Sequence, residues 1–455
     1  MRRSVVTTNR GAFSSFKAEG YPTLWLAGLF SFISVQMQFL LRGILAWDLT
    51  EREGALGLVY LGFGLAMLVS TPLGGVASDR LSKRAVLIGS QTALMVVAVV
   101  MGFAVITGVV QFWMLLIAGV VQGASFGFFG PARVAIAAEI VGREHLGNAI
   151  TLSLLSMNGT RVFAPALAGV LAGVAFIGIG GAYLIAAVCS SVSFIYLLRL
   201  PKPEAAASPP RLALSPQAVT AGPARTPEVE RARPLAEIAA GVRYVWARPP
   251  LRRLVISSFF VIMFGFNYVA FIPALIKGEY GLGDSWVGVI SSAGALGAVL
   301  VSVPLAARAD SVWAKVMMTV AGLGFGLGVI GVGVSGSFWM AFGVIFFIGG
   351  ATTTYQSLSN TLAMAMTDDA HHGRVQSLMQ LSFAGFGIAA LPLGGLAELI
   401  GLRPTIMIMG IVATAAITVY GIFEGGWPGL RPTHGPASAS AERDAALPAA
   451  ATAGS

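Results

Sequence analysis

The sequence predicts an all-α membrane protein in which twelve transmembrane helices form two pseudo-symmetric six-helix bundles. Three observations lead to this prediction: a scarcity of charged residues, a series of long apolar stretches, and basic residues gathered on one side of the expected topology. Of the 455 residues, 56% are hydrophobic and only 11% are charged, whereas a soluble domain carries about 25% charged residues. Stretches so poor in charge are stable only with lipid around them.

Each of the apolar stretches is close to the ~20 residues with which a helix crosses the hydrocarbon core. The first, from Tyr21 to Trp47, is too long for the core of a cleaved signal peptide. The fourth, tenth and eleventh exceed the required length, so we expect them to tilt or to protrude. The expected spans cover residues 22–48, 54–77, 85–107, 111–138, 148–172, 179–198, 254–277, 285–307, 316–334, 338–366, 374–400 and 404–423.

An even number of spans puts both termini on one side of the membrane, and the basic residues gather on that side. Short loops rich in Lys and Arg remain in the cytoplasm. We therefore expect cytoplasmic termini and a location in a bacterial inner membrane. The same distribution explains the net charge of +9 without a nucleic-acid partner. Only five of the 29 Lys and Arg residues lie within spans or on the opposite side: Arg42, Arg52, Arg161, Lys277 and Arg403.

The chain divides at residues 201–234, a stretch rich in Pro, Ala, Ser and Arg that predicts a partly disordered cytoplasmic linker. After it, Leu235, Ile238, Val242 and Val245 recur at helical spacing, as in a short helix that lies at the membrane surface. The expected organisation is a cytoplasmic N-terminal segment (1–20), a first six-helix bundle (21–200), the linker with its interfacial helix (201–250), a second bundle (251–424) and a disordered cytoplasmic tail (425–455).

A proline followed by small residues recurs in the middle span of each of four three-span units. Proline loosens the helix ladder, and small residues allow neighbouring backbones to approach. Ordinary packing of membrane helices would explain any one of these positions, but recurrence in every unit predicts two halves that are each built from two three-helix repeats. The predicted packing or hinge residues are Pro72, Pro165, Gly169, Pro304, Pro392 and Gly394.

The loop after the second span reads GVASDRLSKR, and it resembles the cytoplasmic-gate motif of the major facilitator superfamily. Ser82 stands where the motif has a second glycine, and the second half of the chain has only a partial copy around Asp310. The resemblance implies a secondary transporter with alternating access, in which ion pairs of this loop latch one conformation. The basic residues could equally do no more than fix the topology. The implied gate residues are Gly75, Asp79, Arg80, Lys83 and Arg84.

The segment from Pro131 to Leu171 resembles the branch of this superfamily that contains enterobactin exporters and macrolide-efflux-type proteins. This narrower resemblance implies efflux of a drug-like or siderophore-like compound, and the superfamily as a whole implies coupling to protons. Many drug/proton antiporters have an arginine three residues before the pair that Gln122 and Gly123 form here, whereas this chain has Gly119. Their antiport mechanism is therefore not carried over.

Polar and aromatic side chains form stripes along the first span of each three-span unit, and the fifth span carries a further pair. Side chains three or four residues apart share a helix face, and by the resemblance these faces line the central pathway. Ser, Asn and Gln could instead form hydrogen bonds between helices, worth ~0.6 kcal/mol each. The predicted cavity residues are Gln38, Arg42, Gln122, Phe129, Asn158, Arg161, Phe264, Asn267, Tyr355, Gln356 and Asn360.

Two of these residues, Arg42 and Arg161, carry charge into the membrane. An arginine at mid-bilayer costs ~2.5–3.5 kcal/mol on insertion scales, and no acidic residue lies equally deep nearby in the sequence. We therefore predict a cavity of positive potential with aromatic walls, suited to an anionic or amphiphilic small molecule. Arg161 could instead pair with a backbone carbonyl or extend to the interface. The same shortage of deep carboxylates leaves the coupling residue for protons unassigned.

Enzymatic function is disfavoured, because the sequence contains neither an HExxH zinc motif nor a P-loop. Cys189 is the only cysteine, and the four histidines lack ligand spacing on one helix face. We therefore expect no metal, no cofactor and no catalytic residue. The expected protein is a monomer whose partners are a small-molecule substrate, protons and lipid. An importer or a translocator of lipids or metabolites with the same fold is the alternative. A receptor is disfavoured by the short outer loops.

Overall fold

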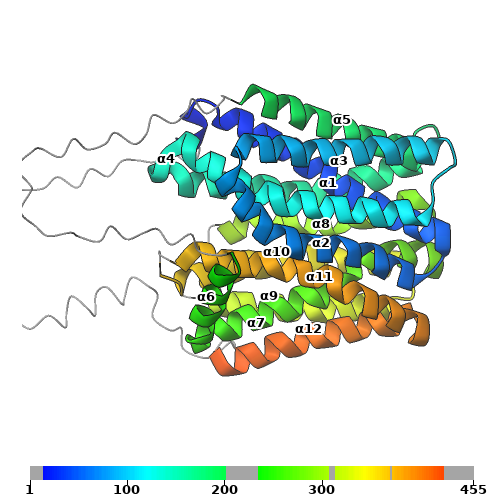
Figure 1. Cartoon of the computed structure of the whole chain (residues 1–455). Coiled ribbons are helices and arrows are strands. Elements are labelled where there is room, and N and C mark those ends of the chain that lie inside the picture. The colour runs from blue at the N-terminus through cyan, green and yellow to red at the C-terminus, as the bar shows by residue number, and fades with distance from the viewer. Residues whose placement is uncertain (1–13, 201–233, 307–312, 369–370, 425–455) are drawn as a thin grey trace, which may run out of the picture.

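The structure is a computed structural model, and it describes residues 14–200, 234–306, 313–368 and 371–424 (Figure 1). Over these residues the chain forms helices and connecting turns, without a strand. Ten helices are long and apolar enough to cross a membrane, and two shorter apolar helices, Gly159–Gly173 and Ala384–Ile400, complete the expected set of crossings. The predicted fold class is therefore confirmed.

In the first half of the chain, the expected fourth and fifth spans join into one element, α4, of 62 residues. Only a sharp kink separates them, at Gly142, whose φ of 71° and ψ of 170° lie outside the helical region. Glycine adopts this conformation readily, whereas a side chain would be strained there. The elements of this half are η1 (Ser14–Lys17), α1 (Tyr21–Thr50), α2 (Glu53–Arg80), α3 (Lys83–Ile106), α4 (Phe112–Gly173) and α5 (Gly178–Arg199).

The second half begins at α6, where the sequence predicts an interfacial helix, and it ends with α12. Its elements are α6 (Pro234–Trp246), α7 (Pro249–Met263), η2 (Gly265–Phe271), η3 (Ala274–Glu279), α8 (Asp284–Ala306), α9 (Ala314–Val334), α10 (Phe338–Ala365), α11 (His372–Ile400) and α12 (Leu402–Glu424).

The expected seventh span, 254–277, is not one regular helix. The α-helical part ends at Met263, and a 3-10 segment (η2) and a π-helical turn (η3) complete the crossing. A Cβ on Gly265 would lie 2.6 Å from the ring of Phe325, so this close contact requires glycine. The Asn267 amide donates hydrogen bonds to the carbonyls of Met263 and Phe386. Such hydrogen bonds from a side chain to the backbone compete with the hydrogen bonds of the helix. Hydropathy does not detect this competition.

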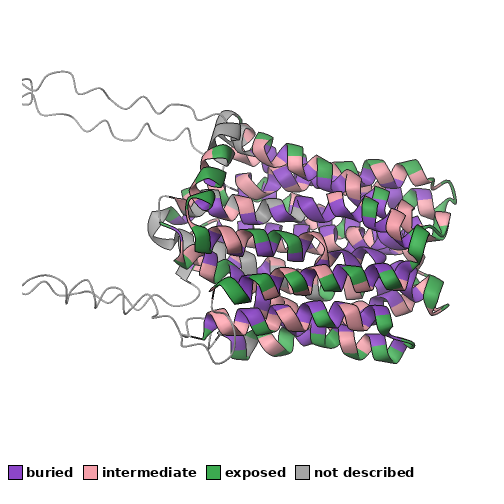
Figure 2. Ribbon diagram, turned by 90° about the horizontal axis from the view of Figure 1, so that it is seen from below, coloured by how far each residue is buried: buried purple, intermediate pink, exposed green. Residues whose placement is uncertain are grey.

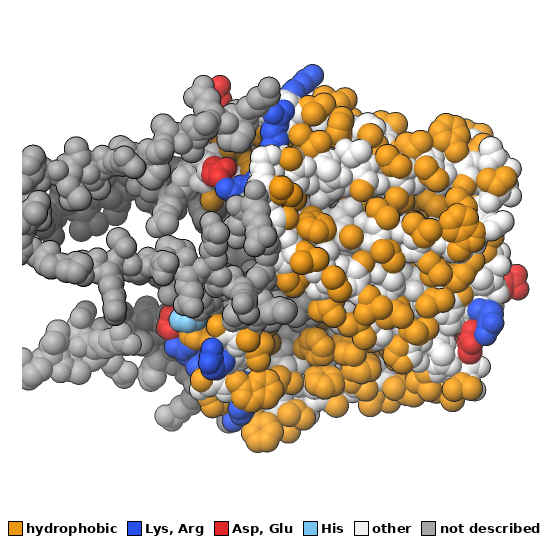
Figure 3. All heavy atoms as spheres, in the orientation of Figure 1, with side chains coloured by type: hydrophobic (Ala, Val, Ile, Leu, Met, Phe, Trp, Pro, Cys, Tyr) orange, Lys and Arg blue, Asp and Glu red, His pale blue; other side chains and the backbone are white. Residues whose placement is uncertain are grey.

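The helices run side by side, and the loops gather at the two ends of the molecule (Figure 1). We call the end where α5 and α12 terminate the linker end, and the end where α1 terminates and α2 begins the far end. Exposed residues lie on the outward faces of the helices and buried residues between them (Figure 2). On the face drawn in Figure 3, hydrophobic side chains cover the middle and charged side chains occur at the two ends. This distribution is the one expected for a protein whose middle part is surrounded by lipid.

The repeated prolines lie inside helices. Pro72 is in α2, Pro165 in α4, Pro304 in α8 and Pro392 in α11. A proline inside a helix removes one hydrogen bond of the ladder and allows bending at that point. Their function as hinges stays a prediction.

Candidate functional site

The two halves of the chain meet in a seam at the far end, where α2 packs on α11 and α4 packs on α8. Glycines bring the backbones of these helices into direct contact. A Cβ on Gly64 would lie 2.7 Å from Cα of Gly387, and a Cβ on Gly169 would lie 2.3 Å from Cα of Gly288. Because real Cβ atoms essentially never approach to within 3.0 Å, this closure requires glycine at these positions. Gly394, a predicted packing residue, lies in the same seam, and its Cβ would be 2.6 Å from the carbonyl oxygen of Glu53.

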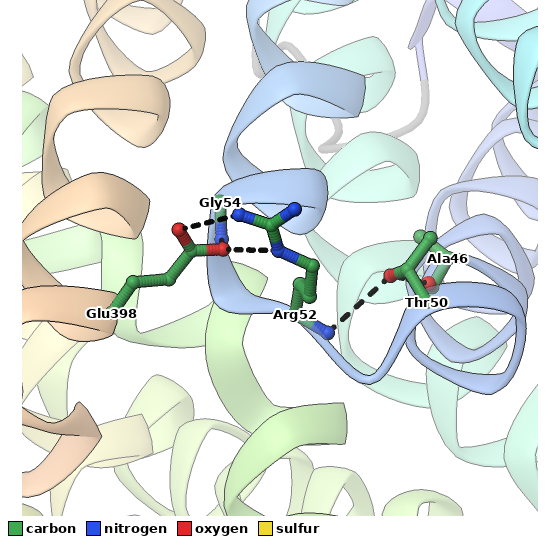
Figure 4. A network of polar contacts seen from close by, with 5 residues as sticks. All are labelled: Ala46, Thr50, Arg52, Gly54 and Glu398. Carbon is green, nitrogen blue, oxygen red and sulfur yellow. Dashed lines mark hydrogen bonds and ion pairs between the residues drawn. The ribbon is translucent and has the colours of Figure 1, made fainter.

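Ion pairs join the two halves at the outer edge of the seam. Glu398, near the end of α11, accepts hydrogen bonds from Arg52 Nε at 3.0 Å and Arg52 Nη2 at 3.1 Å. It also accepts one from the backbone N–H of Gly54, at 3.2 Å, in the first turn of α2. Figure 4 shows the carboxylate of Glu398 pointing at both groups from its own helix. Lys277 forms a second cross-half pair with Asp48 and also binds Asp284 of its own half.

An aromatic cluster closes the seam further inside. Phe386 of α11 lies with its ring centroid 5.9 Å from that of Phe39 and 5.9 Å from that of Tyr60, on α1 and α2. Phe39 and Tyr60 lie 4.6 Å apart, and the Tyr60 hydroxyl donates to the Phe39 carbonyl at 3.2 Å. Glycine contacts, aromatic rings and ion pairs therefore hold the far end closed.

At the linker end, the predicted gate residues Lys83 and Arg84 form hydrogen bonds and an ion pair within their own half. Lys83 pairs with Glu139 of α4. The guanidinium of Arg84 donates to the carbonyls of Leu197 and Leu198 in the last turn of α5, where helix carbonyls lack partners and favour a cation. The surroundings of Gly75, the side chains of Asp79 and Arg80, and the partial copy of the gate motif at 308–310 lie outside what the structure describes. Within the described ranges, the ion pairs that join the two halves lie at the far end.

The helix α6 is attached to the loop between α10 and α11. The Tyr244 hydroxyl donates to Asp368 Oδ2 at 3.0 Å and accepts from the Asp368 backbone N–H at 2.9 Å. Arg248 Nη2 lies 2.6 Å from the same carboxylate oxygen. The rings of Tyr244 and His371 stack at 4.0 Å. We call Tyr244, Arg248, Asp368 and His371 the α6 clamp; it fixes the predicted interfacial helix to the second half.

Removing the Tyr244 hydroxyl is expected to loosen the α6 clamp. The hydrogen bond from Tyr244, followed by the charge of Arg248, lowers the pKa of Asp368 below its ordinary value. A depressed carboxyl pKa contributes stability above the unfolded-state pKa, and this contribution disappears as the pH falls through the folded-state pKa. Tyr244→Phe should therefore raise the pKa of Asp368 and speed hydrogen–deuterium exchange in residues 234–246 at neutral pH. Tyr280→Phe, which removes a bond to Ser335 at the far end, should leave that exchange unchanged.

Arg42 lies inside the first half, behind the aromatic cluster. Its side chain is 2% exposed, and Nη1 donates to Gln122 Oε1 at 2.5 Å, while Gln122 Nε2 donates to the Val35 carbonyl. The guanidinium carbon lies 5.8 Å from each of the Phe39 and Tyr60 ring centroids. Nε and Nη2 of Arg42 have no hydrogen-bond partner in the described part of the chain. Two predicted cavity residues, Arg42 and Gln122, are thus brought together around an unneutralised buried cation.

Polar side chains of the stripe predicted along the first span form hydrogen bonds within the first half. Ser31 donates to Gln91 at 2.8 Å, Ser34 donates to the Ala186 carbonyl at 2.7 Å, and Gln38 donates to Ser34 at 3.0 Å. The first two bonds join α1 to α3 and α5, and the third lies within α1. In this conformation Ser31 and Ser34 form the hydrogen bonds between helices that the sequence left as the alternative, and the assignment of the stripe to the central pathway stays a prediction.

The other predicted cavity residues are found in different environments. Asn360 is exposed on α10, and Arg161, Phe264 and Gln356 are half-buried. The side chain of Asn158 lies outside the described residues. Those that are buried within one half are Phe129, Asn267 and Tyr355.

A buried polar group in the second half links α7 and α10. Ser258 contacts the Tyr355 hydroxyl at 3.3 Å and the Ser359 hydroxyl at 2.8 Å. Nearby on α10, Gln356 Nε2 and Thr352 Oγ1 are buried and lack a hydrogen-bond partner among the described residues. The buried polar groups of this part of the second half are therefore neutral amides and hydroxyls, whereas the first half contains the buried cation of Arg42.

Sequence reasoning missed the far-end residues that close the seam: Tyr60, Phe386 and Glu398. No local pattern marks Glu398, because its partner Arg52 is 346 positions away. Gly64 and Gly387 are small residues inside apolar spans, which is only a weak indication of close helix packing. Arg133 is buried in α4, with its guanidinium 4.9 Å from the Phe32 ring centroid.

Comparison with known proteins agrees with this architecture. The enterobactin exporter EntS of Citrobacter koseri is 23% identical over 403 residues, which cover 88% of this chain and 89% of that protein. A bacterial homologue of the human lysosomal transporter Spinster, in an inward-facing and unoccupied conformation, superimposes with a TM-score of 0.65 at 17% identity, over 92% of this chain and 98% of that one. The nucleoside transporter NupG superimposes with a TM-score of 0.62 at 12% identity, over 89% and 99%. The sequence profile of the Major Facilitator Superfamily matches residues 24–387. The chain therefore belongs to the major facilitator superfamily of membrane transporters.

Proposed function

We propose that this transporter exports a small anionic or amphiphilic compound across the bacterial inner membrane by alternating access, driven by the proton gradient. The observation that carries the proposal is the buried Arg42, with two guanidinium nitrogens that lack partners among the described residues. A charge kept in a low-dielectric interior without a counter-charge is destabilising by several kcal/mol. Such an arrangement is useful when an anion supplies the missing charge.

The aromatic surroundings of Arg42 support an amphiphilic substrate. The rings of Phe39 and Tyr60 each lie 5.8 Å from the guanidinium carbon of Arg42, and Phe386 of the opposite half contacts both rings. Export requires that relative movement of the two halves separates Phe386 from Phe39 and Tyr60 and exposes Arg42 to the space between the halves. A compound with an anionic group and an aromatic or aliphatic body then finds a cation and ring faces together.

Three observations support export from the cytoplasm. The first is the similarity to the enterobactin exporters over most of the chain. The second is the excess of Lys and Arg at the linker end, which favours a cytoplasmic location of that end. The third is that the seam closes the far end, which is the end that an exporter keeps closed while it binds substrate.

Transport by the purified protein in proteoliposomes tests this proposal. We expect counterflow and net transport of anionic amphiphiles, with catecholate siderophores and aryl carboxylates as the first compounds of the panel. An acidic vesicle lumen should speed their accumulation in inside-out vesicles, where the cytoplasmic face is outward. Neutral and cationic compounds of equal size are the matched controls. Transport of cations alone, or no response to the pH gradient, would contradict the proposal.

Import of a metabolite, or translocation of a lipid, by the same fold is the second candidate. The cation at Arg42 suits an anionic metabolite or a lipid phosphate as well. Sidedness separates these functions: an importer would accumulate its substrate in right-side-out vesicles, and a lipid translocator would equilibrate a labelled anionic phospholipid between leaflets.

A further inference from the structure

The strongest unassigned feature is the contact of Glu398 with the beginning of α2. We propose that Glu398 is the positioning residue of the far-end closure: it caps the N-terminus of α2 from the opposite half and so determines how often the far end opens. The proposal requires only the alternating-access part of the proposed function, and neither a particular substrate nor proton coupling.

The N-terminus of α2 lacks a cap of its own. Arg52 occupies the N-cap position, and its side chain accepts no hydrogen bond from the helix. The first N–H groups of a helix have no partner within the helix, and a side-chain oxygen ordinarily supplies one. Here the carboxylate of Glu398 accepts from the N–H of Gly54 at 3.2 Å. It also places a negative charge at the positive end of the helix dipole.

The close approach of the two helices makes this cap possible. A Cβ on Gly54 would lie 2.8 Å from Glu398 Oε1, so glycine leaves the space that the carboxylate occupies. Gly394, one turn before Glu398, is in backbone contact with Glu53. When the far end opens, α11 must leave α2, and the cap and the Arg52 ion pair are lost together.

The hydrogen bond from Gly54 and the ion pair with Arg52 act together in this contact, and both are exposed. The side chain of Arg52 is 70% exposed, and exposed ion pairs contribute little because water and salt screen them. The second ion pair between the halves should stabilise the closed state less. When Asp48 moves away, Lys277 still has its ion pair with Asp284 of its own half. The guanidinium of Arg52 and the N–H of Gly54 each bond Glu398, whereas the backbone N–H of Arg52 donates to the Thr50 hydroxyl of its own half at 3.4 Å.

A spin-label distance measurement in nanodiscs, without substrate, tests the proposal. Labels at Phe176 and Leu399, which are 90% and 83% exposed at the far end on opposite halves, are introduced after Cys189→Ser. Glu398→Ala should raise the far-end-open population by roughly 5- to 30-fold, as expected for loss of a helix cap. Arg52→Ala should have a smaller effect.

Glu279→Ala is the matched control. Glu279 binds Arg403 at 2.7 Å, also at the far end and with comparable exposure, but both residues belong to the second half. It should leave the distance distribution as in the wild type. An unchanged distribution in Glu398→Ala, or an equal shift in Glu279→Ala, would overturn the proposal. Because no transport is measured, this outcome is separate from failure of the proposed export.

Discussion

Replacing Gly64 with alanine is expected to prevent full closure of the far end and to reduce transport strongly. The added Cβ would lie 2.7 Å from Cα of Gly387 and 2.8 Å from the carbonyl oxygen of Ala384. Both are backbone atoms, so neither can move without moving α11. Overpacking of this kind costs about 1–3 kcal/mol, which corresponds to about a 5- to 150-fold shift toward the far-end-open state. Transport rates in proteoliposomes should fall by about tenfold or more.

Gly62→Ala is the control for this prediction, since Gly62 lies two positions away on the same helix. Its Cβ would meet a side-chain carbon of Val120 at 3.4 Å, an ordinary contact within the first half. This variant should transport at the wild-type rate. If both variants lose transport equally, the loss reflects damage to α2 rather than a block of the seam.

Replacing Arg42 with methionine is expected to stabilise the protein and to abolish transport of an anionic substrate. Methionine has a similar length and removes a buried cation that no described carboxylate neutralises. Replacement of buried charged groups by apolar residues often stabilises by ~1–4 kcal/mol, so the substrate-free protein should unfold at a higher temperature. Loss of a buried charge-assisted contact to substrate costs ~2–5 kcal/mol, so the apparent affinity should fall by about 30-fold or more.

The combination of higher stability and lost transport separates a binding role from a structural one. A purely structural arginine would predict lower stability and unchanged transport per folded molecule. Arg42→Lys should retain part of the affinity, because it keeps the charge without the second donor pair. Arg199→Met, at an exposed position near the end of α5, should change neither quantity.

The number and order of the spans could be predicted because hydropathy is a local property of the chain. The repeated prolines and the basic loops likewise depend on nearby residues alone. The irregular seventh span could not be predicted in this way, since its break depends on the contact of Gly265 with Phe325 and on bonds of Asn267 to two carbonyls. The kink at Gly142 is invisible to hydropathy for a related reason, because a conformation and not a polarity defines it.

The candidate site was predicted less completely than the fold. Arg42 and Gln122 were identified from polarity within apolar spans, and the structure brings them together. The hydrogen bonds of Ser31 and Ser34 could not be assigned from the sequence, because their partners depend on where α3 and α5 pack against α1. Glu398 and Phe386 were missed because their roles exist only where two distant helices meet.

The central claim is that two matched halves rock against each other, so that one end opens as the other closes. Two distances measured under the same conditions test it most directly: the Phe176–Leu399 pair at the far end, and a pair at Leu81 and Trp313, which are exposed on opposite halves at the linker end. Comparing the wild type with Gly64→Ala, we predict that the far-end distance lengthens while the linker-end distance shortens. A change at one end only, or lengthening at both ends, would contradict rocking of the two halves.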